Sequence, residues 1–553
     1  MTTQSWQEAE PESVRSAVLR LQRGVQRLLQ AELRAFTGGD TPALERYERE
    51  YLREFRRHQS LVSFGDLLQA ILETDLFFVG DYHTLRQSQD LARRLLERAA
   101  AEPRPLVLAV EMVLQDHQEH LDAYMRGAID DAAFLERIEY HRTWNFDWDN
   151  YRPLFDAARR HGVAVVGINQ ATRGACRNLR ERDEAIAAAL ADTIVARPGA
   201  RLMVLVGDLH LAASHLPRAL DAHLEGLQLQ RKRLVVFQNA DTLYWTLAER
   251  GDGRGTPVVQ LGPDRFCVME VPPYVKLQSY LSWERALEKL HDEEESNSEW
   301  TLEQSAVQLF ETLARQLARF FGLPILSPSC EVFTNLDETF FSTIEHTEGL
   351  EASRAREIRL LAFGNRSCFV PELDLVYLPF FSVNHAAEEA MRALQARVAG
   401  TPARRGDPYE DFYGRAFGAA VGFLGSKLVN PHRLATTEAE FRGFWRGAER
   451  QLHEPRLAFR KLVAHFVVQH QEHERRRLAG GRGRLKQIYE QDLEVLLEVT
   501  FALGYRLGDR LAAALLEGTL APEALRALVF PPPGKLASAR YFDALRALEP
   551  ARR

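Results

Sequence analysis

The sequence predicts an α/β domain with a mainly parallel sheet flanked by helices, followed by a mostly α-helical C-terminal domain. Between residues 76 and 237, short and nearly continuous apolar runs rich in β-branched residues alternate with amphipathic segments such as 182–196. Uninterrupted apolar runs are typical of parallel strands that helices cover on both faces. After about residue 305, apolar positions recur every three or four residues, which indicates helices.

The expected elements follow one another in a regular order. Residues 12–57 have helical spacing with a break at 38–42, where Gly-Gly-Asp-Thr-Pro ends one helix and starts the next. Residues 64–75 predict a further short helix before the first strand. The five expected strands are Leu76–Val79, Leu106–Val110, Val163–Ile168, Leu202–Val206 and Leu234–Phe237.

The length of the chain indicates more than one domain, because 553 residues exceed what one typical core contains. An acidic and polar stretch near 290–305 marks the expected boundary. The expected parts are N-terminal helices packing on the α/β domain (1–58), the α/β domain itself (59–287), a polar linker (288–305) and a helical domain without an assigned role (306–553).

Composition narrows the class of protein. The net charge of −7 provides no basic excess, so we expect no nucleic-acid partner. The four cysteines are scattered and form no Cys-x-x-Cys pair, which fits a reducing compartment. No apolar run reaches the roughly 18 residues of a membrane span, and the N-terminus shows no export signal. We therefore expect a cytoplasmic protein. The oligomeric state is left open, with a homodimer as one alternative.

Two expected strands end in the same short motif. Gly-Asp-Tyr-His occupies Gly80–His83, and Gly-Asp-Leu-His occupies Gly207–His210. In a parallel sheet, ligands bind where the carboxyl ends of strands gather. Gly-Asp alone is a common turn, but its repetition before a histidine at two strand ends favours one shared site.

A third polar residue completes a candidate site. Glu111 directly follows the strand Leu106–Val110, so His83, Glu111 and His210 are predicted to face one cleft. Two imidazoles and a carboxylate can bind a divalent ion such as Mn, Zn or Fe, or can perform metal-free acid–base catalysis. Asp81 and Asp208 are candidates for further oxygen ligands, or for acceptors that orient the imidazoles.

Other candidate cofactor-binding residues have simpler structural alternatives. Tyr82 is a candidate axial haem ligand, although an aromatic residue there more often packs. Trp144 is a candidate wall for an apolar ligand or a core residue. Arg173 and Arg182 are candidates to meet an anionic group, although surface arginines are the simpler interpretation, and His215 is a candidate to line the cleft.

The order of these motifs resembles the Tiki/TraB, erythromycin-esterase-like and ChaN superfamily, and most of all its ChaN branch of haem-binding uptake proteins. The resemblance covers about residues 60–285. The stretches that carry it are VGDYHTLRQSQ, LAVEM, WDNYRPLFDAARRHGVAVVGIN, RDEAIAAALADTI and VGDLHLAASHLP. One departure is Asp81, which stands where the first motif of the superfamily usually has glutamate.

The resemblance implies an α/β domain whose pocket contains His83, Glu111 and His210. Some superfamily members bind haem in such a pocket. Others are metal-dependent peptidases, or esterases in which a histidine is the general base. We therefore expect a small-molecule ligand or haem as the partner. The alternative is a metal-dependent or His/Glu-dependent hydrolase, so enzymatic activity is left open.

Overall fold

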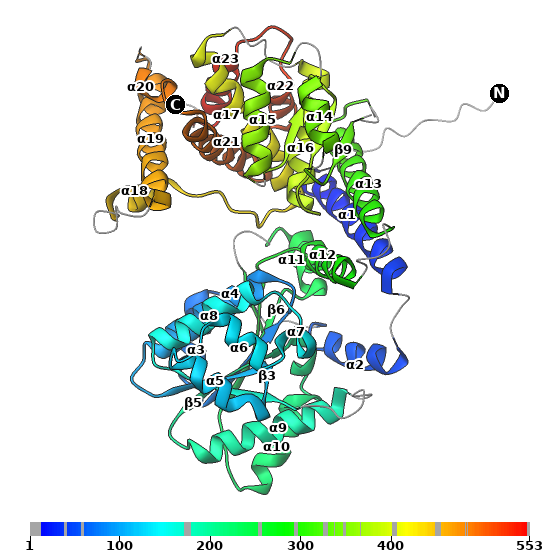
Figure 1. Cartoon of the computed structure of the whole chain (residues 1–553), viewed down its shortest axis with the longest axis vertical. Helices are drawn as coiled ribbons and strands as arrows, with labels where there is room; N and C mark the ends of the chain where they lie inside the picture. The colour runs from blue at the N-terminus through cyan, green and yellow to red at the C-terminus, as the bar shows by residue number, and fades with distance from the viewer. Residues whose placement is uncertain are drawn as a thin grey trace, which may run out of the picture. The chain divides into compact units, whose positions relative to one another are not determined.

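The computed structural model describes most of the chain. The described residues are 13–37, 41–56, 60–170, 179–252, 257–291, 297–324, 330–336, 338–346, 350–364, 366–400, 406–447, 455–481, 483 and 485–549. The chain divides into two compact units, one formed by Leu29–Ala286 and the other by Met1–Leu28 with Leu287–Arg553. We call them the α/β unit and the helical unit (Figure 1).

The α/β unit contains an eight-stranded sheet in the order β1-β7-β8-β6-β2-β5-β3-β4. All five predicted strands are present, as β2 (Leu76–Asp81), β3 (Leu106–Leu114), β4 (Ala164–Asn169), β5 (Arg201–Gly207) and β6 (Arg233–Gln238). They pair in parallel with one another, and the predicted α/β fold class is confirmed. Three strands were not predicted, namely β1 (Ser60–Val62), β7 (Val258–Gly262) and β8 (Arg265–Val268).

The unpredicted strands lie together on one side of the sheet. β7 runs antiparallel to both β1 and β8, while β8 is parallel to β6. β1 has only three residues, and none of them is buried. Such short, partly polar strands carry little of the continuous apolar pattern that identified the central five.

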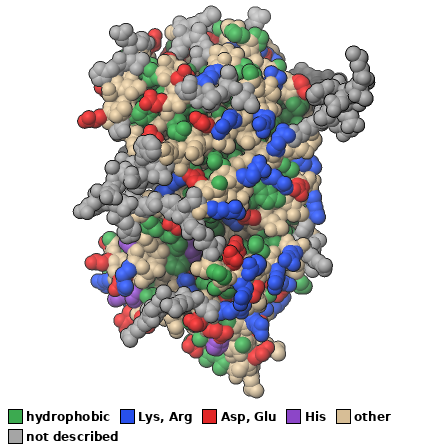
Figure 2. Space-filling view, turned by 90° about the vertical axis from the view of Figure 1, so that its right-hand side faces the viewer, with side chains coloured by type: hydrophobic (Ala, Val, Ile, Leu, Met, Phe, Trp, Pro, Cys, Tyr) green, Lys and Arg blue, Asp and Glu red, His purple; other side chains and the backbone are tan. Residues whose placement is uncertain are grey.

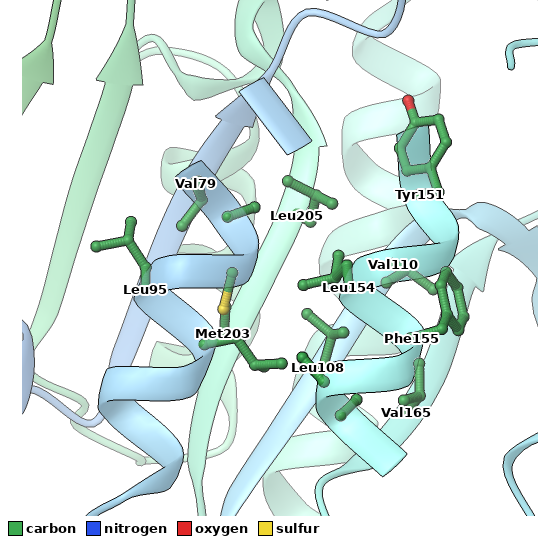
Figure 3. Close-up of a cluster of buried hydrophobic side chains, with 14 of the residues drawn as sticks. Val79, Leu95, Leu108, Val110, Tyr151, Leu154, Phe155, Val165, Met203 and Leu205 are labelled. Atoms are coloured by element: carbon green, nitrogen blue, oxygen red, sulfur yellow. The ribbon is translucent and has the colours of Figure 1, made fainter. Parts of the chain in front are cut away.

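Helices cover both faces of the sheet. One face carries α3 (Phe64–Leu72), α4 (Arg86–Ala100) and α8 (Trp148–Arg160), and the other carries α9 (Leu179–Ala196), α10 (Leu216–Gly226) and α11 (Asp241–Arg250). Successive residues alternate between the faces, so that Val79 packs in the first layer and Phe78 in the second. Figure 3 shows Leu95, Leu154 and Phe155 packed on the first face. The remaining elements of the unit are α5 (Gln118–Met125), α6 (Asp131–Arg137), α7 (Tyr140–Thr143), two short 3-10 turns at Gln115–His117 and Asp208–Leu211, and α12 (Pro273–His291), which continues past Ala286.

The register of the central strands places the two repeated motifs side by side. β2 and β5 are neighbours, and their pairing aligns Gly80 with Val206 and Asp81 with Gly207. β5 also pairs with β3, whose Val110 lies opposite Leu205. The carboxyl ends of β2, β5 and β3 therefore meet at one edge.

The predicted N-terminal helices are α1 (Val14–Thr37) and α2 (Pro42–Arg53). They were expected to pack together on the α/β domain, but Met1–Leu28 groups with the helical unit. There Gln22 donates a hydrogen bond to the carbonyl of Leu428 (3.2 Å). Helical spacing predicts that an apolar stripe is buried but does not identify what it packs on, which explains the difference.

The helical unit is mostly α-helical, as predicted. Its helices are α13 (Asn297–Phe320), α14 (Glu338–His346), α15 (Ala352–Phe363), α16 (Val383–Ala399), α17 (Pro408–Val429), α18 (Glu438–Gly447), α19 (Pro455–Leu478), α20 (Lys486–Tyr489), α21 (Leu493–Leu516), α22 (Pro522–Val529) and α23 (Ala537–Ala547). A small sheet in the order β10-β11-β9 was not predicted, and its strands are Cys368–Val370, Leu375–Tyr377 and Glu331–Phe333.

Within the described ranges, no helix is both long enough and apolar enough to span a membrane. Acidic and basic side chains both occur on the face that Figure 2 shows.

Candidate functional site

Both repeated motifs need their glycines because other site residues occupy the adjacent space. A Cβ at Gly80 would lie 1.8 Å from Asp208 Oδ1. A Cβ at Gly207 would lie 3.2 Å from His83 Nε2 and 3.4 Å from His210 Cδ2. The glycine of each motif therefore leaves room for side chains of the other.

Buried partners fix the orientation of His83. Its Nδ1 lies 2.8 Å from Asp81 Oδ2, and Asp81 also accepts hydrogen bonds from Tyr151 (2.7 Å) and Gln89 (2.5 Å). Burial alone would lower the pKa of His83, but the hydrogen bond and charge of Asp81, with the charge of Glu111, raise it above its ordinary value. Asp81 thus orients the imidazole through Nδ1, which leaves Nε2 directed elsewhere.

His210 has a matching arrangement. Its Nδ1 lies 2.6 Å from Asp183 Oδ1, at the start of α9. Tyr47, on α2, donates a hydrogen bond to Asp183 Oδ2 (2.8 Å), and its hydroxyl lies 3.1 Å from His210 Nδ1. A second carboxylate therefore holds the second imidazole by the same nitrogen.

Glu111 lies between the two imidazoles. Its Oε1 accepts a hydrogen bond from Arg182 and its Oε2 accepts one from the Gly207 amide, each at 2.7 Å. Its carboxylate oxygens are 4.0 Å from His83 Nε2 and 3.7 Å from His210 Nε2. Burial would raise the pKa of Glu111, but the charges of Arg182 and both histidines, with the Gly207 hydrogen bond, lower it.

The three predicted side chains are thus brought together, while their functional roles remain predictions. The geometry gives the expected divalent-ion alternative no support. Within the described parts of the chain, no group of three or more His, Cys, Asp or Glu side chains is arranged to hold a metal ion.

Two predicted residues lie beside this cluster instead of within it. The Tyr82 ring lies under Lys276, whose Nζ is 5.3 Å from the ring centroid, and burial raises the pKa of its phenol to about 12. His215 stacks on Tyr47 (3.6 Å between centroids), and its Nε2 lies 3.1 Å from Glu50 Oε2. His215 therefore secures α2 against the site.

Asp208 also points away from the imidazoles. Tyr51 donates a hydrogen bond to its Oδ2, and the Gln238 amide donates one to its Oδ1 (3.3 Å). Burial raises the pKa of Asp208 to about 7. Its carboxyl is half-buried and packs beside Gly80.

The raised pKa of Asp208 predicts a pH-dependent stability. An unfolded aspartate loses its proton near pH 4, whereas Asp208 in the folded protein keeps its proton up to about pH 7. The free energy of unfolding therefore falls as the pH rises through that window. Between about pH 5 and pH 8, the free energy of unfolding of wild type should fall by up to roughly 3 kcal/mol relative to that of Asp208→Asn. Urea unfolding of both proteins at the two pH values measures this difference, and a difference that does not change with pH would contradict it.

Aromatic side chains continue from His83 toward the surface. The His83 ring packs on Trp144 (4.5 Å between centroids) and on Phe146 (4.9 Å). Phe146 stacks on Trp283 (4.6 Å), which in turn contacts Tyr280. Phe146, Trp283 and Tyr280 are only partly buried. We call these three residues, with Trp144, the aromatic row.

Several site residues were not predicted. Asp183 and Tyr47 bond His210, but a single aspartate in a predicted helix and a tyrosine about 160 residues away offer no pattern that could identify them. Arg182 was considered together with Arg173, and the structure places it on Glu111. Arg173 lies outside the described residues.

A family model described as haem-binding uptake, Tiki superfamily, ChaN matches residues 67–181. This part of the chain is ChaN-like. The ChaN-like segment contains His83, Glu111 and Trp144, and it ends before Asp183 and His210.

Two solved structures were also compared with the chain. One is described as cofacial heme binding to ChaN of Campylobacter jejuni, with 15% identity, a TM-score of 0.26, and coverage of 32% of this chain and 87% of that chain. The other is the type III effector HopBA1, with 15% identity, a TM-score of 0.26, and coverage of 37% and 90%. No curated protein matches the chain.

Proposed function

We propose that the α/β unit binds haem at the edge where β2, β3 and β5 end, with His83 as the iron ligand. The observation that carries the proposal is the state of the His83 imidazole. Its Nδ1 bonds Asp81, while its Nε2 accepts no hydrogen bond from the described residues. A carboxylate on one ring nitrogen increases the basicity of the other, which would suit a ligand of haem iron.

The surroundings of His83 also fit a flat, largely apolar group. The aromatic row starts at the imidazole and presents partly exposed rings. The side chain of His83 is 24% exposed, against 6% for His210, so His83 is the more accessible of the two. The ChaN-like match over 67–181, a haem-binding family, supports the same choice of ligand. When bound, haem would supply an iron centre for electron transfer or for binding small ligands.

Hemin titration of the full chain tests the proposal. We expect a saturable shift of the Soret absorbance band, with affinity at least about tenfold weaker in His83→Ala because the proposed iron ligand is lost. His161→Ala is the matched control, since His161 is exposed. Tyr82→Phe should bind as wild type does. Equal affinity of His83→Ala and His161→Ala would contradict His83 as the ligand.

A second function, hydrolysis, is favoured by one observation. Two carboxylate–imidazole pairs, Asp81–His83 and Asp183–His210, both present Nε2 toward the ionised Glu111. One imidazole would take a proton from water and the other would protonate the leaving group. Arg182 and the Gly207 amide would hold Glu111 as the central anion.

Ester and peptide turnover distinguishes this function from haem binding. If the cluster is hydrolytic, turnover should be lost in His210→Ala and in Glu111→Gln, and assays with EDTA, or with Mn²⁺ or Zn²⁺ added back, show whether a metal takes part. Turnover that is unchanged in both variants would reject the hydrolytic role while leaving the hemin result to stand by itself.

A further inference from the structure

The helical unit contains a cavity of about 420 Å³. Its walls come from α15, α16, α17 and α21, with strand β10 at one side. The cavity lies entirely within the helical unit, and its lining does not include His83, Glu111 or His210. Its volume lies within the range of small-molecule sites, roughly 300–1,000 Å³.

Three guanidinium groups line this cavity. Arg354 and Arg415 clamp Glu357 at 2.8 and 3.1 Å. The Nε atoms of Arg354 and Arg415 are buried and form no hydrogen bond with the described residues, although Arg354 Nε lies 3.6 Å from Glu372 Oε1. Arg392 lines the same space. Because charged guanidinium groups line the cavity, it favours a ligand that supplies acceptor oxygens.

The remaining wall is largely apolar. Leu361, Phe417, Leu497 and Phe501 line it. Cys368 also lines the cavity, and burial raises the pKa of its thiol to about 12, so the sulfur stays protonated and behaves as a small apolar group. A hydrocarbon or aromatic body would bury against these side chains.

Carboxylates restrict the charge of the ligand. Besides Glu357, the lining contains Glu351, Glu372, Glu410 and Asp411. Glu410 accepts hydrogen bonds from Ser538, and Glu372 is 40% exposed. These negative charges oppose a ligand with several anionic groups. One acceptor head group with an apolar body is the class that satisfies both the arginines and the carboxylates.

We propose that this cavity binds an amphipathic monocarboxylate, with its carboxylate at Arg354 and Arg415 and its apolar body against Phe417 and Leu497. The two guanidinium groups supply charge-assisted donors.

Gly418 is a position at which a larger side chain would fill the cavity. It lines the cavity on α17, and a Cβ built there meets no heavy atom within 4 Å. Gly418→Leu would fill the space and favour the helix, since glycine is about 1 kcal/mol worse than alanine inside a helix. Gly443→Leu is the matched control, because Gly443 is an exposed glycine of α18 whose Cβ also meets nothing within 4 Å.

Isothermal titration of the full chain with octanoate, and with 1-octanol as its neutral counterpart, tests the proposal. Octanoate should bind wild type and Gly443→Leu alike, and bind Gly418→Leu about tenfold or more weakly. Arg415→Met should bind octanoate about tenfold less tightly while its affinity for octanol changes little. No octanoate binding to wild type, equal binding of octanoate and octanol, or undiminished binding to Gly418→Leu would each overturn it. If Arg415→Met does not fold, the Gly418→Leu result decides.

Discussion

Replacing Glu111 with glutamine should destabilise the α/β unit by roughly 2–3 kcal/mol. Glu111 is 1% exposed and is the charge partner of Arg182 within the cluster. Glutamine keeps the shape and can still accept from the Gly207 amide, but it removes the negative charge. Arg182 and any protonated histidine would then face a neutral amide. Breaking a buried ion pair from one side is costly because the other charge stays behind.

Hydrogen exchange of peptides covering 106–114 and 201–207 measures this effect within the α/β unit, alongside urea unfolding. The matched control is Glu97→Gln. Glu97 bonds Arg93 (2.8 Å) and Arg160 (2.9 Å) with its side chain 26% exposed. Such partly exposed pairs contribute about 0–1 kcal/mol. If the two substitutions destabilised the unit equally, the buried charge cluster would not be the source of the effect.

Replacing Gly80 with alanine should lower the free energy of unfolding by roughly 3 kcal/mol, although it adds only one methyl group. The new Cβ would lie 1.8 Å from Asp208 Oδ1 and 2.8 Å from its Cγ. Asp208 would have to move, and it would lose the hydrogen bonds from Tyr51 and the Gln238 amide.

A double substitution tests this cause. When Asp208→Ala is already present, Gly80→Ala should lower the free energy of unfolding much less than it does in wild type, because the clashing carboxyl is gone. Gly199→Ala should be nearly neutral, since a Cβ there meets nothing within 4 Å. Strictly additive costs for Gly80→Ala and Asp208→Ala in urea unfolding would contradict the proposed contact.

Much of the α/β fold could be predicted because its cause is local. Continuous apolar runs identify buried parallel strands, and all five predicted strands lie in the sheet. The repeated Gly-Asp-x-His motif indicated that two strand ends share an edge, and β2 and β5 are neighbours with their motifs side by side, offset by one residue. Short edge strands such as β1 and the three-residue strands of the helical unit are too brief for such a pattern.

The partners of the histidines could be predicted only in part. Asp81 lies two residues from His83, so its role as an acceptor follows from the motif. Asp183 and Tyr47 reach His210 through packing of α9 and α2, which depends on the whole fold. Asp208 shows the limit of the analogy between the motifs, because it occupies the position equivalent to Asp81 but bonds Tyr51 in place of the histidine.

His83 is proposed as the iron ligand in place of His210 because its imidazole is the more accessible of the two. Both imidazoles are held by Nδ1, so orientation alone does not distinguish them. The aromatic row lies only on the His83 side among the ring contacts of the described residues, whereas His210 packs against Tyr47. The proposed planar ligand would therefore lie next to His83, and His210 would influence the charge of the site through Glu111.

The most direct measurement of the central claim is an anomalous difference map, collected at the iron absorption edge, from crystals of the full chain grown with hemin. The account predicts one iron peak within bonding distance of His83 Nε2, with the porphyrin against Phe146 and Trp283. An iron peak on Tyr82, at the cavity of the helical unit, or nowhere on the protein would contradict it.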